Sequence, residues 1–192
     1  MDLAISRLIK RMKELGYVVF EEGQYNLNLV GIRSKDRMSN TFNDWICCFY
    51  KDETDTWKFH EWKATTDPGT YWLKNPGRVE GTAILCEGQH RAAFTLGLHH
   101  GDYECLVQCI PVRVYRDADK DSTLDLVNPE FTFSGIHIHR ANPSRESTVV
   151  DQWSAGCQVL ANPSDFSEMM SLYKKSAAKW GSKITYTLLE EF

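Results

Sequence analysis

The two ends of the chain carry apolar residues at the spacing of amphipathic helices. Near the N-terminus the apolar stripe comprises Leu3, Ile5, Leu8, Ile9, Met12 and Leu15. Asp2 can cap this helix and Gly16 can end it. Near the C-terminus a second stripe runs from Ser164, a candidate N-cap, to Trp180, and Gly181 follows directly. We therefore expect one helix at each end of the chain.

Between Tyr17 and about Arg140 the pattern changes to short alternating stretches of β-branched and aromatic residues, separated by Gly, Pro, Asn and Asp. These stretches predict strands at NLNLVGIR, DWICCFYK, TWKFHEWKA, GTYWL, ECLVQCIPVRVYR and FTFSGIHIHR. The segment HRAAFTLG also suits one or two helical turns, and KITYTLL predicts a final strand. The expected fold class is mainly β (α+β), with the sheet flanked by the two helices.

The length and composition suit one globular domain. The chain has 192 residues, of which 42% are hydrophobic and 12% aromatic, enough for a sizeable core. No internal repeat, low-complexity segment or linker divides it. We expect an N-terminal amphipathic helix at 1–16, followed by a single compact unit at 17–192.

Charge and hydropathy narrow the range of partners. The formal net charge is −4, which gives no broad basic surface and argues against non-specific nucleic-acid binding. No apolar stretch is long enough to cross a bilayer, so no integral membrane segment is expected. The N-terminal residues lack the uninterrupted apolar region of a signal peptide. The expected compartment is the cytoplasm in which the chain is made.

The cysteines suggest reduced thiols rather than a metal framework. The six are Cys47, Cys48, Cys86, Cys105, Cys109 and Cys157. No C-x-x-C pair occurs, and neither close pair has a spacing typical of zinc. For all but Cys157, the simplest interpretation is a core thiol in a reducing compartment.

One acidic segment raises the question of calcium. DADKDSTLD spaces four carboxylates like the first half of a calcium loop, at Asp117, Asp119, Asp121 and Asp125. Ser122 replaces the glycine that such a loop needs, and Asn128 stands in place of its glutamate. A solvated hairpin is favoured there, and no cofactor is expected.

The segment from His137 to Cys157 carries the candidate chemistry. GIHIHR alternates, so a strand would place His137 and His139 on one face. Farther along, SAGC offers small residues that let the backbone N–H groups of Gly156 and Cys157 meet an oxyanion. A thiol becomes nucleophilic when an imidazole takes its proton or stabilises its charge. Isolated histidines and cysteines are more often structural, so spacing alone leaves both interpretations open.

These residues resemble the active-site signature of the L,D-transpeptidase catalytic (YkuD-like) family, a strand-end histidine, a spacer, and Ser/Thr-His-Gly-Cys. The spacer here is fourteen residues from His139 or sixteen from His137. A second stretch, TTDPGTYWL at 65–73, is similar to the family's TPxGxF/Yxl hairpin. The resemblance implies a YkuD-like β-sandwich or curved sheet, with Cys157 as nucleophile and His139 as its base. It also implies that the backbone carbonyl of Arg140 orients His139.

Two positions depart from the family pattern. Ala155 replaces the histidine that usually precedes the glycine, and Val159 replaces an arginine or asparagine two residues after the cysteine. Those side chains shape substrate binding in the family. The departures favour hydrolysis over transpeptidation.

A wider pattern, from EGQHRAAFTLG through GIHIHRANP to VDQWSAGCQV, resembles cell-wall proteins encoded by bacteriophages and prophages. The resemblance implies a phage-type endolysin, a cysteine peptidase that cleaves stem peptides or cross-links of bacterial peptidoglycan. Such an enzyme accumulates in the host cytoplasm and depends on a holin to reach the periplasm and cell wall. Two alternatives stay open: an L,D-transpeptidase that forms cross-links, and a non-catalytic wall-binding virion protein on the same fold.

Several side chains are candidates for substrate contact, namely His137, Arg140, Ser154, Trp153, His90 and Arg91. His99 and His100 in LHHG could also line a cleft and meet a peptide carboxylate. Trp153 suits a core position equally well, and surface or capping roles suit His90, Arg91, His99 and His100. A zinc hydrolase has no support from spacing. His137 and His139 would need further ligands, which the sequence does not identify.

Overall fold

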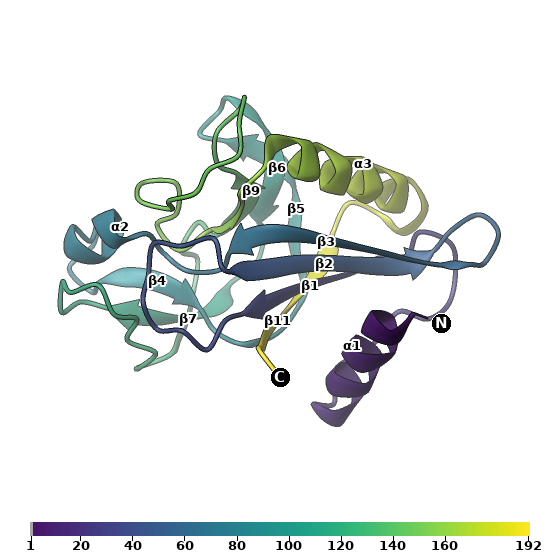
Figure 1. The fold of residues 1–192 in the computed structure, drawn as a ribbon, viewed down its shortest axis with the longest axis horizontal. Coiled ribbons are helices and arrows are strands. Elements are labelled where there is room, and N and C mark those ends of the chain that lie inside the picture. The colour runs from purple at the N-terminus through teal and green to yellow at the C-terminus, as the bar shows by residue number, and fades with distance from the viewer. Residues whose placement is uncertain (1) are drawn as a thin grey trace.

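The computed structural model describes residues 2–192 as eleven strands and three helices (Figure 1). The helices are α1 (Leu3–Glu14), α2 (Thr70–Lys74) and α3 (Pro163–Trp180). The strands are β1 (Asn28–Arg33), β2 (Asp44–Lys51), β3 (Trp57–Thr65), β4 (Thr82–Leu85), β5 (Gly88–His99), β6 (Tyr103–Gln108), β7 (Val112–Asp117), β8 (Glu130–Thr132), β9 (His137–Arg140), β10 (Gln158–Leu160) and β11 (Ile184–Glu190). The mainly β (α+β) class is confirmed.

Eight strands close into a barrel in the order β1-β11-β5-β6-β9-β10-β3-β2. The remaining three form a small sheet in the order β4-β7-β8. Closure depends on β1, which pairs parallel with β11 and antiparallel with β2. The expectation of a sandwich or curved sheet is thus met only in its β content, because a closed barrel leaves no free edge in the main sheet.

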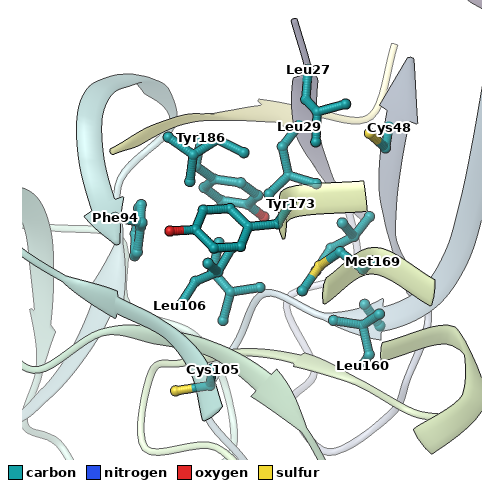
Figure 2. Close-up of a cluster of buried hydrophobic side chains, with 14 of the residues drawn as sticks. Leu27, Leu29, Cys48, Phe94, Cys105, Leu106, Leu160, Met169, Tyr173 and Tyr186 are labelled. Atoms are coloured by element: carbon teal, nitrogen blue, oxygen red, sulfur yellow. The ribbon is translucent and has the colours of Figure 1, made fainter. Parts of the chain in front are cut away.

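The barrel interior holds the largest apolar cluster, and α3 contributes one side of it. Figure 2 shows Met169 and Tyr173 of α3 among barrel residues that include Leu29, Phe94 and Tyr186. Burial of such side chains stabilises the fold by roughly 25 cal/mol per Å² of apolar surface removed from water.

The helix α1 covers an outer face of the barrel. Its apolar stripe packs on Val30, Cys47, Phe49 and Leu189 from β1, β2 and β11. These strands are therefore buried on both faces, which explains why WICCFY is apolar without strict alternation. The adjacent Cys47 and Cys48 point to opposite sides, one toward α1 and one into the barrel.

The helix limits follow the capping residues. Asp2 caps α1 as expected, by accepting a hydrogen bond from the N–H of Ala4. The N-cap of α3 is Asn162 rather than the expected Ser164, since Pro163 suits the first helical position and the Asn162 side chain accepts from Ser164 N–H.

Two local predictions are wrong. GTYWL forms the short helix α2 instead of a strand, because Leu73 is buried against Ile84 and Leu124. HRAAFTLG belongs to the strand β5, since β5 pairs with β11 and with β6. An irregularity near Ala92, whose φ is +49°, lets one strand pair with two partners.

Candidate functional site

An open cleft of about 1120 Å³ lies where β9, the β5–β6 hairpin and the loop 141–157 meet. Its walls include Trp72, His99, Tyr103, Arg140, Trp153 and Cys157. The cleft therefore brings the HIHR strand and the SAGC turn to one surface, together with a hairpin that the sequence argument did not single out.

The parallel pairing of β9 with β10 explains how Cys157 reaches the histidines. The register pairs Ile138 with Gln158 and His139 with Val159. One step earlier, the backbone N–H of His137 donates to Cys157 Sγ at 3.4 Å. Side chains alternate across a strand, so His137 and His139 both face the cleft while Ile138 packs inside the barrel.

His139 is held in one orientation. Its Nδ1 lies 2.8 Å from the carbonyl oxygen of Arg140, as the family resemblance implies. A carbonyl only accepts, so Nδ1 carries the proton and Nε2 is left with its lone pair free. The Tyr103 hydroxyl also donates to the Arg140 carbonyl, at 3.2 Å. Among residues 2–192, Nε2 of His139 has no hydrogen-bond partner although it is buried.

The imidazole of His139 is neutral at physiological pH. Burial first, and then the neighbouring ring of His99, lower its pKa to about 3. The two rings stack with centroids 4.0 Å apart. The free Nε2 of His139 has the geometry to accept a proton, but with a pKa of about 3 the ring is a weak base until a nearby negative charge raises that pKa.

Cys157 rests as a thiol. Part of the residue faces the cleft, but protein surrounds the sulfur closely enough that burial raises its pKa to about 11, against the opposing effect of the His137 N–H. The sulfur is directed at backbone, with the Gly135 carbonyl 3.8 Å away. The expectation of an ionised sulfur held by an imidazole is therefore not met in the resting site.

The SAGC turn is fixed from within. The Ser154 hydroxyl donates to the Cys157 carbonyl at 2.8 Å and accepts the Gly156 N–H at 3.1 Å. Gly156 has φ +112°, and a Cβ there would lie 2.1 Å from the Ala83 carbonyl oxygen. Only glycine fits this position. Because its N–H is already bonded, the oxyanion role expected for Gly156 is not open to it in this conformation.

The second motif, residues 65–73, packs directly on this turn. The Gly69 N–H donates to the Ser154 carbonyl at 2.8 Å, and a Cβ on Gly69 would lie 1.9 Å from the Asp151 carbonyl oxygen. The indole N–H of Trp72 donates to the Gln152 carbonyl at 3.0 Å. The two matched motifs are therefore in contact, although the upstream one is a loop and short helix instead of the expected hairpin.

A buried ionic cluster lies behind the turn. The Arg33 side chain is fully buried, with Nη1 2.6 Å from Glu87 and Nε 2.8 Å from Asp67. Its Nη2 donates to the carbonyls of Thr66 and Leu85, each at 3.0 Å. We call Arg33, Asp44, Asp67 and Glu87 the Arg33 cluster.

The Arg33 cluster reaches the turn through hydrogen bonds. Asp44 accepts the Thr66 N–H at 2.6 Å and the Thr66 hydroxyl at 2.8 Å. The Gln158 amide donates to the carbonyls of Thr66 and Gly156, each at 3.4 Å. The cluster thus contacts both matched motifs, and none of its members lines the cleft.

The expected substrate contacts divide into two groups. His137, Arg140 and Trp153 line the cleft, with the Arg140 guanidinium 3.9 Å from the ring centroid of Tyr103. Ser154 is not exposed to substrate, because it is fully buried and its hydroxyl is used inside the turn.

His90 and Arg91, expected as substrate contacts, do not line the cleft. His90 Nε2 bonds the Cys86 carbonyl at 2.9 Å, and Arg91 lies outside the cleft with its guanidinium 6.0 Å from the ring centroid of Phe20. The irregularity in β5 separates both residues from His99, which ends the same strand at the cleft.

The LHHG segment makes His99 a candidate from the sequence, and the structure places it in the cleft wall. The sequence analysis missed Tyr103, which also lines the cleft, and Cys105, which is buried beside His137. The register pairs His99 with Tyr103 across the β5–β6 hairpin and Val107 with His137 across β6 and β9. LHHGDY contains the glycine turn of a hairpin, and YECLV alternates after it. Those signals predict the hairpin, but they do not show which strand lies beside it.

The acidic segment forms no convergent carboxylate set among the described residues. Asp117 is buried in β7 and accepts the Asp125 N–H at 3.0 Å. The side chains of Asp119 and Asp121 accept backbone N–H groups within their own turn. Burial, and then neighbouring carboxylates, raise the pKa of Asp117 to about 6.

Comparisons with protein-family models, with curated protein sequences and with solved structures find no match for this chain. Over residues 2–192, no helix combines the length and apolar character needed to traverse a bilayer.

Proposed function

We propose that the protein is a cysteine peptidase that cleaves stem peptides or cross-links of bacterial peptidoglycan. One observation carries the proposal: in the cleft that also contains Cys157, His139 presents a buried Nε2 with no hydrogen-bond partner among residues 2–192, while the Arg140 carbonyl fixes its other nitrogen. Leaving a buried nitrogen unpaired costs roughly 1–3 kcal/mol, so such a group favours a functional over a structural role.

Catalysis begins from a neutral pair. As Cys157 Sγ attacks the amide carbonyl carbon, its proton passes to His139 Nε2. The protonated imidazole then gives that proton to the departing amine, and the C–N bond breaks to leave a thioester. Water, deprotonated by His139, attacks the thioester, and the returned proton restores the thiol as the carboxylic acid leaves.

The reaction requires the sulfur to move. Cys157 and His139 are offset by two residues along neighbouring strands, about 6.6 Å. In the resting site the sulfur bonds to the backbone of His137 instead of to the imidazole. A change of side-chain rotamer toward the cleft, made as substrate binds, would bring Sγ to Nε2.

The oxyanion that forms on the substrate carbonyl must be stabilised by backbone N–H groups next to Gly156. Its own N–H is bonded to Ser154, so we assign the role to the N–H groups of Ala155 and Cys157. Ala155 is exposed and lines the cleft, so a substrate carbonyl can approach its backbone.

The cleft suits a short branched peptide with a free carboxylate. Arg140 supplies a cation at its wall, and Trp72 and Trp153 supply aromatic surface at its rim. The choice of peptidoglycan as the substrate rests on the family resemblance. Val159, one of the departures from that family, is fully buried beside His139 and so offers substrate nothing.

The test is incubation of purified protein with isolated sacculi, beside Cys157→Ala and the matched control Cys109→Ala. Cys109 is another partly exposed thiol, and it is not among the residues that line the cleft. Mass spectrometry of the soluble fraction should show released muropeptides for the wild type and the control, and none for Cys157→Ala.

The other outcomes each name a different function. Release by Cys157→Ala at the wild-type rate would refute the cysteine mechanism. New cross-links in the digested sacculi would identify a transpeptidase. Sacculus binding without release, equal in wild type and Cys157→Ala, would identify a wall-binding module.

A further inference from the structure

We propose that His99, Cys105 and His137 bind a divalent cation of the zinc class in the wall of the cleft. Their ligand atoms all lie within 4.8 Å of one another. His99 Nδ1 is 3.1 Å from His137 Nδ1, and Cys105 Sγ is 3.9 Å from His137 Nδ1. Across residues 2–192, no other three His, Cys, Asp or Glu side chains converge in this way.

Two of the three separations are close to those of a tetrahedral site, and the third is within 4.8 Å. Zinc binds nitrogen at about 2.0–2.1 Å and sulfur at about 2.3 Å, so neighbouring ligands lie about 3.4 Å apart for two nitrogens and about 3.6 Å for nitrogen and sulfur. The distances of 3.1 Å between the two nitrogens and 3.9 Å between nitrogen and sulfur each differ from these values by about 0.3 Å. Small side-chain rotations would close that gap.

The barrel register builds the trio. The three residues come from β5, β6 and β9, which are hydrogen-bonded neighbours. Gly97 pairs with Cys105, and its lack of a side chain makes room for Val107, since a Cβ there would lie 2.6 Å from Val107 Cγ2. In Figure 2, Cys105 lies at the edge of the packed cluster, apart from its centre.

The donor set selects the metal class. Two imidazole nitrogens and one thiolate favour zinc and its neighbours over calcium or magnesium, which prefer oxygen. Binding requires Cys105 to lose its proton to solvent, and the bound metal then stabilises the thiolate. His99 and His137 line the cleft, so a cation can enter there and keep a fourth coordination position open to it.

The site adjoins the candidate nucleophile. His137 supplies Nδ1 to the trio and its backbone N–H to Cys157 Sγ. A cation at the trio would attract the Cys157 thiolate into its open position and remove it from attack. This consequence rests on the proposed function, whereas the binding itself does not.

Binding is tested with the full chain, freed of metal by a chelator and titrated with Co²⁺ alone. We expect one Co²⁺ per chain and a sulfur-to-cobalt charge-transfer band that Zn²⁺ abolishes by displacement. Cys105→Ser should lose the band. The matched control Cys48→Ser, which replaces another buried cysteine of the barrel core, should keep it.

Two further variants guard against misfolding and misassignment. His99 is partly exposed, so His99→Ala is expected to fold, and it should weaken Co²⁺ binding by at least about tenfold. Cys157→Ala should retain the charge-transfer band. A band that follows Cys157 instead of Cys105, or no stoichiometric binding, would overturn the proposal and leave the contact between His99 and His137 as a simple hydrogen bond.

The inhibitory consequence has a separate readout. One equivalent of Zn²⁺ should slow release of muropeptides by the wild type, and Cys105→Ser, which changes a residue outside the cleft lining, should lose that sensitivity to Zn²⁺. Binding without inhibition would retain the metal site and refute only its coupling to Cys157. If no muropeptides were released under any condition, the proposed function would be refuted. The metal site would still be tested independently by the cobalt spectrum.

Discussion

Two polar clusters flank the SAGC turn, and they are built in opposite ways. In the Arg33 cluster each nitrogen of a buried guanidinium has an oxygen partner within 3.1 Å. In the cluster that lines the cleft, His139 Nε2 has no partner among the described residues, and the Nδ1 atoms of His99 and His137 face each other.

The difference indicates a structural role for the Arg33 cluster and a reactive role for the residues that line the cleft. Satisfied polar groups in a low-dielectric interior hold one geometry, because every alternative leaves a charge unpaired. Unsatisfied groups keep bonding capacity for something that arrives later, a proton, a metal ion or a substrate. Cys157 lies between the clusters, anchored through Gln158 on one side and open to the cleft on the other.

Removing the guanidinium should give the largest effect. Arg33→Met would leave the carboxylates of Asp67 and Glu87 buried without their cation. Loss of one partner of a buried ion pair costs about 3–5 kcal/mol, and chemical denaturation measures the change in unfolding free energy.

Arg37→Met is the matched control. Arg37 pairs with Glu190 at 2.7 Å, and the two side chains are 39% and 42% exposed, so the loss should stay within about 1 kcal/mol. Equal losses for the two variants would show that the Arg33 cluster contributes no more than a surface pair, and the contrast between the clusters would fail.

Local patterns in the sequence predict part of this arrangement. Alternation in GIHIHR correctly places His137 and His139 on one face, and the apolar period correctly places α1 and α3. The bond from His139 Nδ1 to the Arg140 carbonyl is present as the family resemblance implies.

The rest depends on pairings between distant strands. His99 and Cys105 reach His137 only because β6 lies between β5 and β9, and no local pattern specifies that order. Arg33 has the appearance of a polar strand end in GIRS, yet carboxylates from three other segments enclose it. His90 and Arg91 are misplaced because the irregularity in β5 is invisible to periodicity.

The protonation state of Cys157 sharpens the comparison. The Arg33 cluster places a guanidinium beside carboxyl groups, of which Asp67 has a pKa raised to about 7, chiefly by burial. The cleft instead holds a thiol with a pKa of about 11 beside an imidazole with a pKa of about 3. Only the thiolate is alkylated, so the rate at which iodoacetamide modifies Cys157 should rise about tenfold per pH unit from roughly pH 7 to 10.

Peptide mass mapping assigns the modified cysteine, and Cys157→Ala should remove that signal. A resting thiolate–imidazolium pair would instead give fast alkylation with little pH dependence near neutrality. That result would restore the ionised sulfur expected from the sequence and would contradict the neutral starting state of the mechanism.

Two tyrosine substitutions are expected to give the smallest effects. They also test most directly whether the cleft residues serve catalysis and the Arg33 cluster serves stability. The Tyr103 hydroxyl donates to the Arg140 carbonyl that also orients His139, and the Tyr115 hydroxyl donates to Glu87 at 3.0 Å. Each phenylalanine variant keeps its ring and loses one hydrogen bond, worth about 1 kcal/mol.

Tyr103→Phe should therefore slow muropeptide release by up to about fivefold while the unfolding free energy changes little, since His139 Nδ1 still occupies the Arg140 carbonyl. Tyr115→Phe should lower the unfolding free energy by about 1 kcal/mol and leave the rate of release unchanged. The paired measurement is informative because both residues are partly buried tyrosines that differ mainly in the cluster they serve. If Tyr103→Phe lowered only stability, or Tyr115→Phe only the rate, the assignment of chemistry to one side of the turn and support to the other would be wrong.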